Sequence, residues 1–217
     1  MQLLFSQLPR DGSTIDIQAL FFKFTMDYAT EFLFGKSAHS LTSPEGSEAA
    51  EFGEAFDLAQ SRLGQRSRLG RLVALVRDKK FDNACKVVHQ FADEIILSAL
   101  ERSRPKDAEK SIESKDHPER YTFLDELVKS TQNPKQIRDE LLNILLAGRD
   151  TTASLLGNTL HVLAQRPDIW KALKAEVDTL DGKLPDYDTL RNLQYLKCLL
   201  NECTFPSTME YFQTDIL

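Results

Sequence analysis

A run of six residues near the middle of the chain has side-chain types that can do chemistry. It places a glycine, an acid and two threonines inside a long apolar segment: Ala147-Gly148-Arg149-Asp150-Thr151-Thr152. Helix interiors favour Leu and Ala, and a buried acid or hydroxyl is costly unless it has a hydrogen-bond partner. We therefore expect this run to serve chemistry rather than packing.

The chemistry that suits the spacing is proton delivery to a small ligand lying against the helix. Ala147 and Gly148 remove side-chain bulk, so a flat cofactor or small ligand can approach the backbone closely. Thr151 follows on the same face one turn later, where its hydroxyl can bond back to the carbonyl of residue 147 or 148, or hold a water. Asp150, beside it, can relay protons if its carboxylate reaches water.

A purely structural explanation is also open for the same run. Threonines in apolar helices often satisfy their hydroxyls by bonding to the preceding turn. In that case Arg149 and Asp150 would simply face solvent.

The composition limits the classes of protein to which the chain can belong. Its 217 residues suffice for one domain with a real core or for two small ones. A net charge of -6, from 27 basic and 33 acidic residues, argues against nucleic-acid binding. The chain has three cysteines without a CxxC spacing, Cys85, Cys198 and Cys203, which indicates a reducing, intracellular compartment. We expect each of them to act as a small buried apolar residue. We find no signal peptide and no membrane-spanning apolar stretch.

Hydrophobic periodicity predicts a mainly α chain with negligible strand content. We expect helices over residues 14–35 (ending at Gly35), 48–63, 81–102, 122–131, 168–180 and 190–201, and a loop over 36–47. The longest helix should begin at Pro134, with Asn133 as its N-cap, and end at Gln165. Because apolar residues between Leu141 and Leu146 cover its whole circumference, we expect this helix to be buried.

Other candidate sites are weaker. The four histidines (His39, His89, His117 and His161) lack metal-binding spacing, and we expect His161 to be a core or groove residue. No nucleotide-binding or hydrolase motif occurs. The basic segment 62–80 is either a solvated face or a contact with an anionic membrane surface. Phe52 and Phe56 are either core residues or the lining of a substrate channel.

The run at 147–152 resembles the A-G-x-[DE]-T-[TS] motif of the cytochrome P-450 haem-thiolate monooxygenases. Further segments agree with that family: Arg166-Pro167-Asp168 with Trp170, residues 190–197, and Asn201-Glu202. Upstream, Asp11-Gly12-Ser13-Thr14 and residues 29–35 resemble the fungal subfamily that hydroxylates n-alkanes and fatty acids. The resemblance covers roughly residues 8–203 and implies the central helical portion of that fold, with its long buried central helix and without its β-rich parts.

The resemblance also implies roles for the motif. Thr151 would hydrogen-bond oxygen at the haem iron, and Asp150 would feed protons to it. Ala147, Gly148 and Thr152 would lie against the haem. A NADPH-dependent flavoprotein reductase would supply electrons, long-chain alkanes or fatty acids would be the substrates, and full-length relatives would reside at the endoplasmic reticulum membrane.

The sequence departs from the family pattern after Glu202. Phe205 stands where the family's Glu-x-x-Arg motif has its arginine, and no F-x-x-G-x-R-x-C-x-G loop supplies an axial cysteine. We expect residues 1–203 to form a partial helical domain with a charged segment at 102–120, which is either a surface loop or a linker between domains. We expect residues 204–217 to be an out-of-family tail, and the isolated chain to be an inactive fragment. The alternative function is that of a non-catalytic helical remnant or interaction protein.

Overall fold

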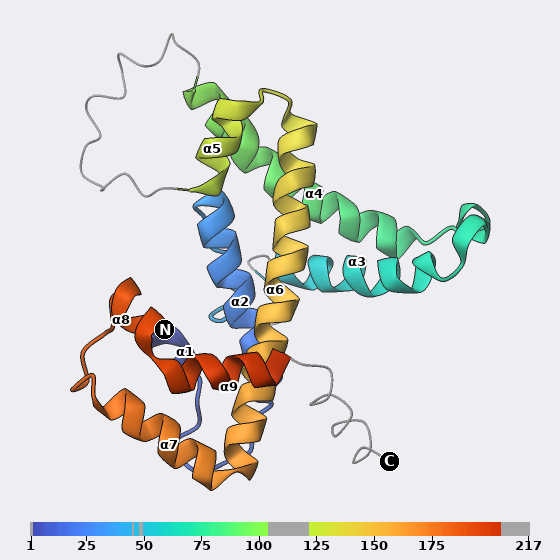
Figure 1. Cartoon of the computed structure of the whole chain (residues 1–217). Coiled ribbons are helices and arrows are strands. Elements are labelled where there is room, and N and C mark those ends of the chain that lie inside the picture. The colour runs from blue at the N-terminus through green and yellow to red at the C-terminus, as the bar shows by residue number, and fades with distance from the viewer. Residues whose placement is uncertain (1, 45, 48–49, 104–121, 205–217) are drawn as a thin grey trace. The chain divides into compact units, whose positions relative to one another are not determined.

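The computed structural model describes residues 2–44, 46–47, 50–103 and 122–204, and within them it contains helices but no strand (Figure 1). The α-helices are α1 (Gln2–Ser6), α2 (Ile17–Phe34), α3 (Glu51–Ser67), α4 (Lys79–Arg102), α5 (Phe123–Ser130), α6 (Pro134–Gln165), α7 (Pro167–Asp178), α8 (Tyr187–Asn192) and α9 (Gln194–Thr204), and the 3-10 helix η1 is Gly70–Leu75. The predicted mainly α fold is confirmed. The charged segment is described only at residues 102–103, and the predicted tail only at Thr204.

The chain divides into two compact units, residues 1–150 and 151–217, and α6 belongs to both. As predicted, α6 begins at Pro134 and ends at Gln165. The side chain of Asn133 caps its first turn by accepting from the backbone N–H of Lys135 at 3.1 Å. No described helix is both long and apolar enough to cross a membrane.

In the first unit, α2 holds the loop that follows it through two side chains. Gly35 ends α2 in the left-handed conformation, with φ 73°. Its N–H donates a hydrogen bond to the backbone carbonyl of Glu31 at 2.9 Å. The Thr30 hydroxyl donates to the Met26 carbonyl at 2.8 Å and accepts from the N–H of Ala38 at 3.0 Å. The loop is therefore folded back onto α2 by side-chain bonds to its backbone.

The Asp27 carboxylate adds two more bonds to this loop. It accepts from the backbone N–H groups of Ser40, at 2.6 Å, and Leu41, at 3.0 Å. These bonds satisfy buried or half-buried backbone donors that no strand or helix would pair.

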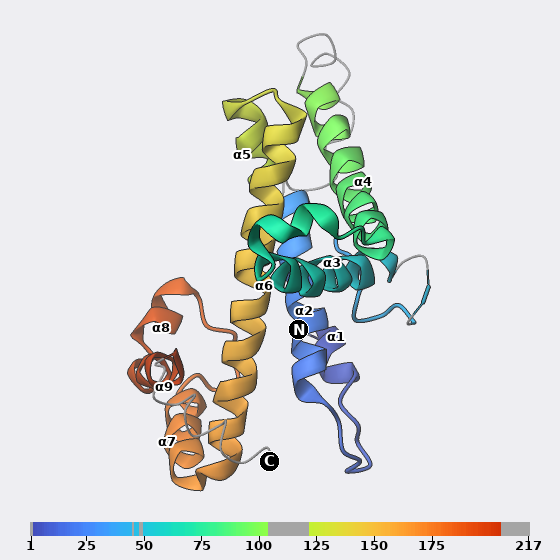
Figure 2. The same ribbon diagram turned by 90° about the vertical axis from the view of Figure 1, so that its right-hand side faces the viewer.

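Helices α3 and α4 run in opposite directions and are joined by η1 (Figure 1), and Figure 2 shows the pair from the side of this connection. Three predicted boundaries of this pair need correction, and the first is the start of α3, which is Glu51 instead of residue 48. Helix α3 runs four residues past 63, because Gly64 is tolerated inside an exposed turn. Helix α4 begins at Lys79 because the Asp78 carboxylate caps the N–H groups of Lys80 and Phe81, both at 3.1 Å.

The core of the first unit combines buried side chains from α2 to α6. Residues that contribute to it include Met26, Leu33, Phe52, Phe56, Val88, Ile96, Leu124, Ile137, Leu141 and Leu145. Phe52 stacks on Phe91 with ring centroids 4.0 Å apart, which joins α3 to α4. Arg138 of α6 pairs with Asp93 of α4 at 2.7 Å.

The expectation that α6 is buried all round is wrong for its middle turns. Leu141 and Leu145 are fully buried, but Ile144 and Leu146 remain 37% and 36% exposed. A helix turns its side chains through every direction. The packed elements of the first unit cover one side of α6 and leave the other side open.

In the second unit, α7 begins at Pro167, directly after the Arg166 N-cap position. Arg166 binds Asp168 with both Nε and Nη2, at 2.9 and 2.7 Å. These side-chain hydrogen bonds lower the pKa of Asp168 to about 2. A small apolar cluster formed by Leu163, Leu199 and Cys203 packs against α7.

The predicted single helix over 190–201 is wrong, because the structure divides it into α8 and α9. Leu193 has an extended backbone, with ψ 92°, and separates the two. The Glu176 carboxylate accepts from the N–H groups of Tyr195 and Leu196, at 2.8 and 2.9 Å, so it caps a new helix start. A carboxylate from α7 therefore decides where α9 begins.

The hydroxyl of Thr30 yields the first testable prediction. Thr30→Val leaves the N–H of Ala38 without its acceptor and should lower the free energy of unfolding by about 1–3 kcal/mol. Thr25→Val is the matched control, because Thr25 is also buried in α2 but bonds only to carbonyls of its own helix. Urea unfolding of the 217-residue chain measures both. Equal losses in the two variants would contradict the assigned role.

Candidate functional site

The motif at 147–152 lies in the uninterrupted helix α6. Ala147 and Gly148 are exposed, and a Cβ atom added at Gly148 would meet no atom within 4 Å. A side of the helix is therefore open to close approach, as the small side chains led us to expect. Thr151 and Thr152 follow as exposed residues, and the bond from Thr151 to a carbonyl of residue 147 or 148 stays a prediction.

Arg149 does not face solvent, which corrects the structural alternative considered above. Its side chain is only 6% exposed. The guanidinium carbon lies 5.2 Å from the ring centroid of Phe22 and 5.6 Å from that of Phe56. Such cation–π contacts suit the planar, weakly hydrated guanidinium.

Two carboxylates neutralise this buried cation. Asp57 of α3, which is 57% exposed, forms a close ion pair with Nη1 of Arg149. The same Nη1 lies 3.3 Å from Oδ1 of Asp150. A buried guanidinium without such partners would be strongly unfavourable, so the pairing holds α3 against α6.

Asp150 is held by a second residue of α3. Gln60 Nε2 donates a short hydrogen bond to Oδ2 of Asp150, whose side chain is 30% exposed. The acid therefore contacts solvent while both of its oxygens are engaged by protein donors. The carboxylate therefore meets the condition for proton relay stated above, which is contact with water.

Sequence reasoning missed Asp57 and Gln60. A signal for Gln60 was present, because it lies four residues after Phe56 and so belongs to the inward face of α3. A polar residue at such a position needs a hydrogen-bond partner. For Asp57, which is mostly exposed, the local sequence held no comparable signal.

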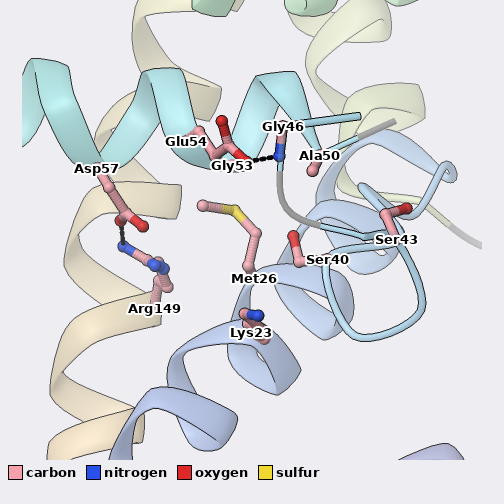
Figure 3. A pocket seen from close by; sticks show the side chains of 10 residues that line it. All are labelled: Lys23, Met26, Ser40, Ser43, Gly46, Ala50, Gly53, Glu54, Asp57 and Arg149. Carbon is pink, nitrogen blue, oxygen red and sulfur yellow. Dashed lines mark hydrogen bonds and ion pairs between the residues drawn. The ribbon is translucent and has the colours of Figure 1, made fainter. Parts of the chain in front are cut away.

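A cavity of about 410 Å³ adjoins the Arg149–Asp57 pair (Figure 3). It is lined by Lys23, Met26, Ser40, Ser43, Gly46, Ala50, Gly53, Glu54, Asp57 and Arg149. Two lining atoms, Nε of Arg149 and Oγ of Ser40, are buried and find no hydrogen-bond partner in the described part of the chain.

A smaller groove of about 240 Å³ lies on the other flank of α3. Its lining is mainly apolar and includes Phe56, Ala59, Leu63, Phe81, Val88, Leu142 and Leu146. The polar side chain of Gln60 also lines this groove. Phe56 is thus both a core residue and part of this groove, and Phe52, a core residue stacked on Phe91, lines a separate cavity of about 410 Å³.

The cysteines and histidines occupy separate environments. Cys85 is half-buried, and burial raises the pKa of its thiol. Cys203 is buried as expected, but Cys198 is exposed, which corrects that expectation. His161 is also exposed, with a ring nitrogen 2.8 Å from Gln165, so it is not a core residue. Among the described residues, no group of three potential ligands could hold a metal ion.

The fold and site define a helical segment in which one long helix carries a solvent-reaching acid, a neighbouring threonine and an open glycine face. The family model for cytochrome P450 matches residues 5–203. The chain belongs to the cytochrome P450 family.

Curated relatives support this membership over most of the chain. Cytochrome P450 52A12 of Debaryomyces hansenii is 42% identical over an alignment 220 positions long, which covers 93% of this chain and 41% of the relative. Cytochrome P450 52A5 of Candida maltosa is 39% identical, with coverage of 98% and 43%. The chain thus spans about two fifths of the length of these relatives.

Solved structures support the fold. The crystal structure of the cytochrome P450DA heme domain matches with a TM-score of 0.74 at 20% identity, covering 93% of this chain and 42% of that one. This likeness confirms that the helices form part of the cytochrome P450 fold.

The ion pair at Arg149 yields the second prediction. Asp57→Ala leaves a buried guanidinium with one remaining acid and should lower the free energy of unfolding by about 1–3 kcal/mol. Arg149→Met, which keeps the apolar packing, should change it by less than about 1 kcal/mol, because the two acids are then solvated. The double variant should be no less stable than Arg149→Met alone. Additive losses in urea unfolding would contradict the pairing.

Proposed function

We propose that this chain provides the central helical part of a haem-dependent monooxygenase that hydroxylates long-chain aliphatic substrates, alkanes or fatty acids. The observation that carries the proposal is the Asp150 carboxylate, which is held by two donors and reaches solvent beside Thr151 on α6. Family membership supports the same conclusion. A NADPH-dependent flavoprotein reductase would supply the electrons, and the full-length protein would reside at the endoplasmic reticulum membrane.

The described residues fit one side of a haem site. The open side of α6 at Ala147 and Gly148 admits a flat group, and nothing stands within 4 Å of a Cβ at Gly148. Ala147, Gly148 and Thr152 would lie against the haem, which when bound supplies the iron that activates dioxygen.

Proton handling would fall to Asp150 and Thr151. The carboxylate of Asp150 exchanges protons with solvent, since it is 30% exposed, while its two protein donors keep it in one place. The Thr151 hydroxyl both donates and accepts, so it can pass a proton onward and orient a water. A positioned acid of this kind typically contributes a factor of about 10²–10⁴ in rate.

A third prediction tests these roles in a chimeric enzyme, called the exchanged enzyme below. This enzyme is Cytochrome P450 52A12 in which the matching segment is replaced by residues 5–203 of this chain. Asp150→Asn and Thr151→Val should each lower hydroxylation of dodecane or dodecanoic acid by about 10²-fold and reduce the product formed per NADPH consumed. Asp139→Asn is the matched control, because Asp139 is a partly exposed acid of the same helix that pairs with Lys135.

Two results would contradict the proposed function. The first is that the exchanged enzyme forms no product from either substrate. The second is that its Asp150→Asn variant hydroxylates as fast as the parent. An effect of Asp139→Asn equal to that of Asp150→Asn would show a general charge effect instead.

We further propose that the 217-residue chain alone does not hold haem through a thiolate. Cys203 is buried in the apolar cluster of the second unit, Cys85 is half-buried with a raised pKa, and Cys198 is an isolated surface residue. The raised pKa disfavours the iron-binding thiolate at Cys85, and neither Cys198 nor Cys203 lies in a segment that matches the family's F-x-x-G-x-R-x-C-x-G loop.

The fourth prediction concerns the spectrum of the chain expressed with added haem. The reduced carbon monoxide difference spectrum should show no thiolate-type Soret band. A thiolate band in the chain, retained in Cys198→Ser, would overturn this proposal and identify Cys85 or Cys203 as a ligand.

The exposed apolar residues of α6 favour a second candidate function, a non-catalytic helical remnant or interaction protein. Ile144 and Leu146 leave apolar surface exposed that would bind a partner or promote aggregation. Product formation by the exchanged enzyme separates this candidate from the first, because a remnant would not support catalysis.

A further inference from the structure

The two oxygens of the Asp150 carboxylate are held by different side chains. Gln60 Nε2 donates to Oδ2, and Nη1 of Arg149 lies 3.3 Å from Oδ1. An ionised carboxylate only accepts hydrogen bonds, so Gln60 must present its amide nitrogen rather than its oxygen. The carboxylate has about four acceptor sites, which leaves two for water or for a neighbouring hydroxyl.

The donor on Oδ1 is itself immobilised. Arg149 is 6% exposed, packs over the rings of Phe22 and Phe56, and pairs with Asp57. Rotation of its side chain would break the ion pair and lose both ring contacts. Helices α2 and α3 therefore determine where this donor lies.

The donor on Oδ2 is restricted in a different way. Gln60 is half-buried and lines the apolar groove beside Leu63 and Leu146. An amide in such surroundings loses free energy if it leaves its polar partner, and Asp150 is the partner that the structure shows. Its side chain therefore prefers the conformation that reaches Asp150.

We propose that Gln60 and Arg149 are positioning residues that fix the Asp150 carboxylate, with Asp57 as the anchor of Arg149. Together they leave two acceptor sites of the acid free for the proton path toward Thr151. This inference rests on the proposed function for its catalytic consequence. The positioning itself is a property of the first unit and needs no haem.

The direct test is NMR spectroscopy of the ¹⁵N,¹³C-labelled 217-residue chain. The side-chain amide of Gln60 should give slowly exchanging signals that move in Asp150→Asn. In Gln60→Leu the ¹³Cγ signal of Asp150 should shift and broaden, because one of its oxygens loses its donor. Gln60→Lys keeps a donor of sufficient length and should retain a sharp Asp150 signal.

Gln65→Leu is the matched control, because Gln65 lies in the same helix, is exposed and contacts Arg62. It should leave the Asp150 signal unchanged. The inference is overturned if Gln60→Leu leaves the Asp150 signal as in the parent, or if Gln65→Leu moves it equally.

The exchanged enzyme gives the fifth prediction and a second readout if Gln60→Leu unfolds the isolated chain. Gln60→Leu should lower the product formed per NADPH about tenfold and change the solvent deuterium isotope effect. Gln60→Lys should recover most of that loss, and Gln65→Leu should match the parent. A merely structural role would lower the folded amount and leave the isotope effect unchanged.

The two proposals fail in distinguishable ways. If Asp150→Asn abolishes turnover while Gln60→Leu changes neither the NMR signal nor the isotope effect, the positioning role is wrong and the proposed function stands. The proposed function is wrong if substitution of Gln60 changes the NMR signal of Asp150 as expected but Asp150→Asn does not affect turnover.

Discussion

The polar site of the first unit depends on one buried charge, the guanidinium of Arg149. It lies between two aromatic rings and would be strongly unfavourable without a counter-ion. Asp57 of α3 and Asp150 of α6 both supply one. The need to neutralise this group determines which acids of α3 and α6 lie beside it, and so where the Asp150 carboxylate stands.

The surrounding fold makes that position stable. The stacked rings of Phe52 and Phe91 join α3 to α4, and bonds from Asp27 and Thr30 hold the loop that closes the cavity beside Arg149. Asp150 consequently lies where an apolar core meets water. A carboxylate there can exchange protons with solvent and still keep a defined direction, which is what proton delivery to a bound ligand requires.

Helix α6 serves two purposes along its length. Leu141 and Leu145 belong to the core, Leu146 lines the groove beside α3, and Ile144 and the small residues at 147 and 148 are exposed. In the second unit the same helix packs Leu163 against α9, whose first turn is capped by Glu176 of α7. Ala147 and Gly148 leave this stretch of α6 open to close approach.

The sequence by itself determined the mainly α fold, both ends of α6, the end of α2 at Gly35, and the family through the motif at 147–152. These features rest on local signals, because caps, glycines and helical periodicity act within a few residues. Only the tertiary structure decided that Arg149 is buried, that Asp57 and Gln60 hold the site, and that Cys198 and His161 are exposed. The partners of Arg149 and Asp150 lie 92 and 90 residues away, so no local pattern could name them. The same reason explains the break between α8 and α9, which a carboxylate from another helix creates.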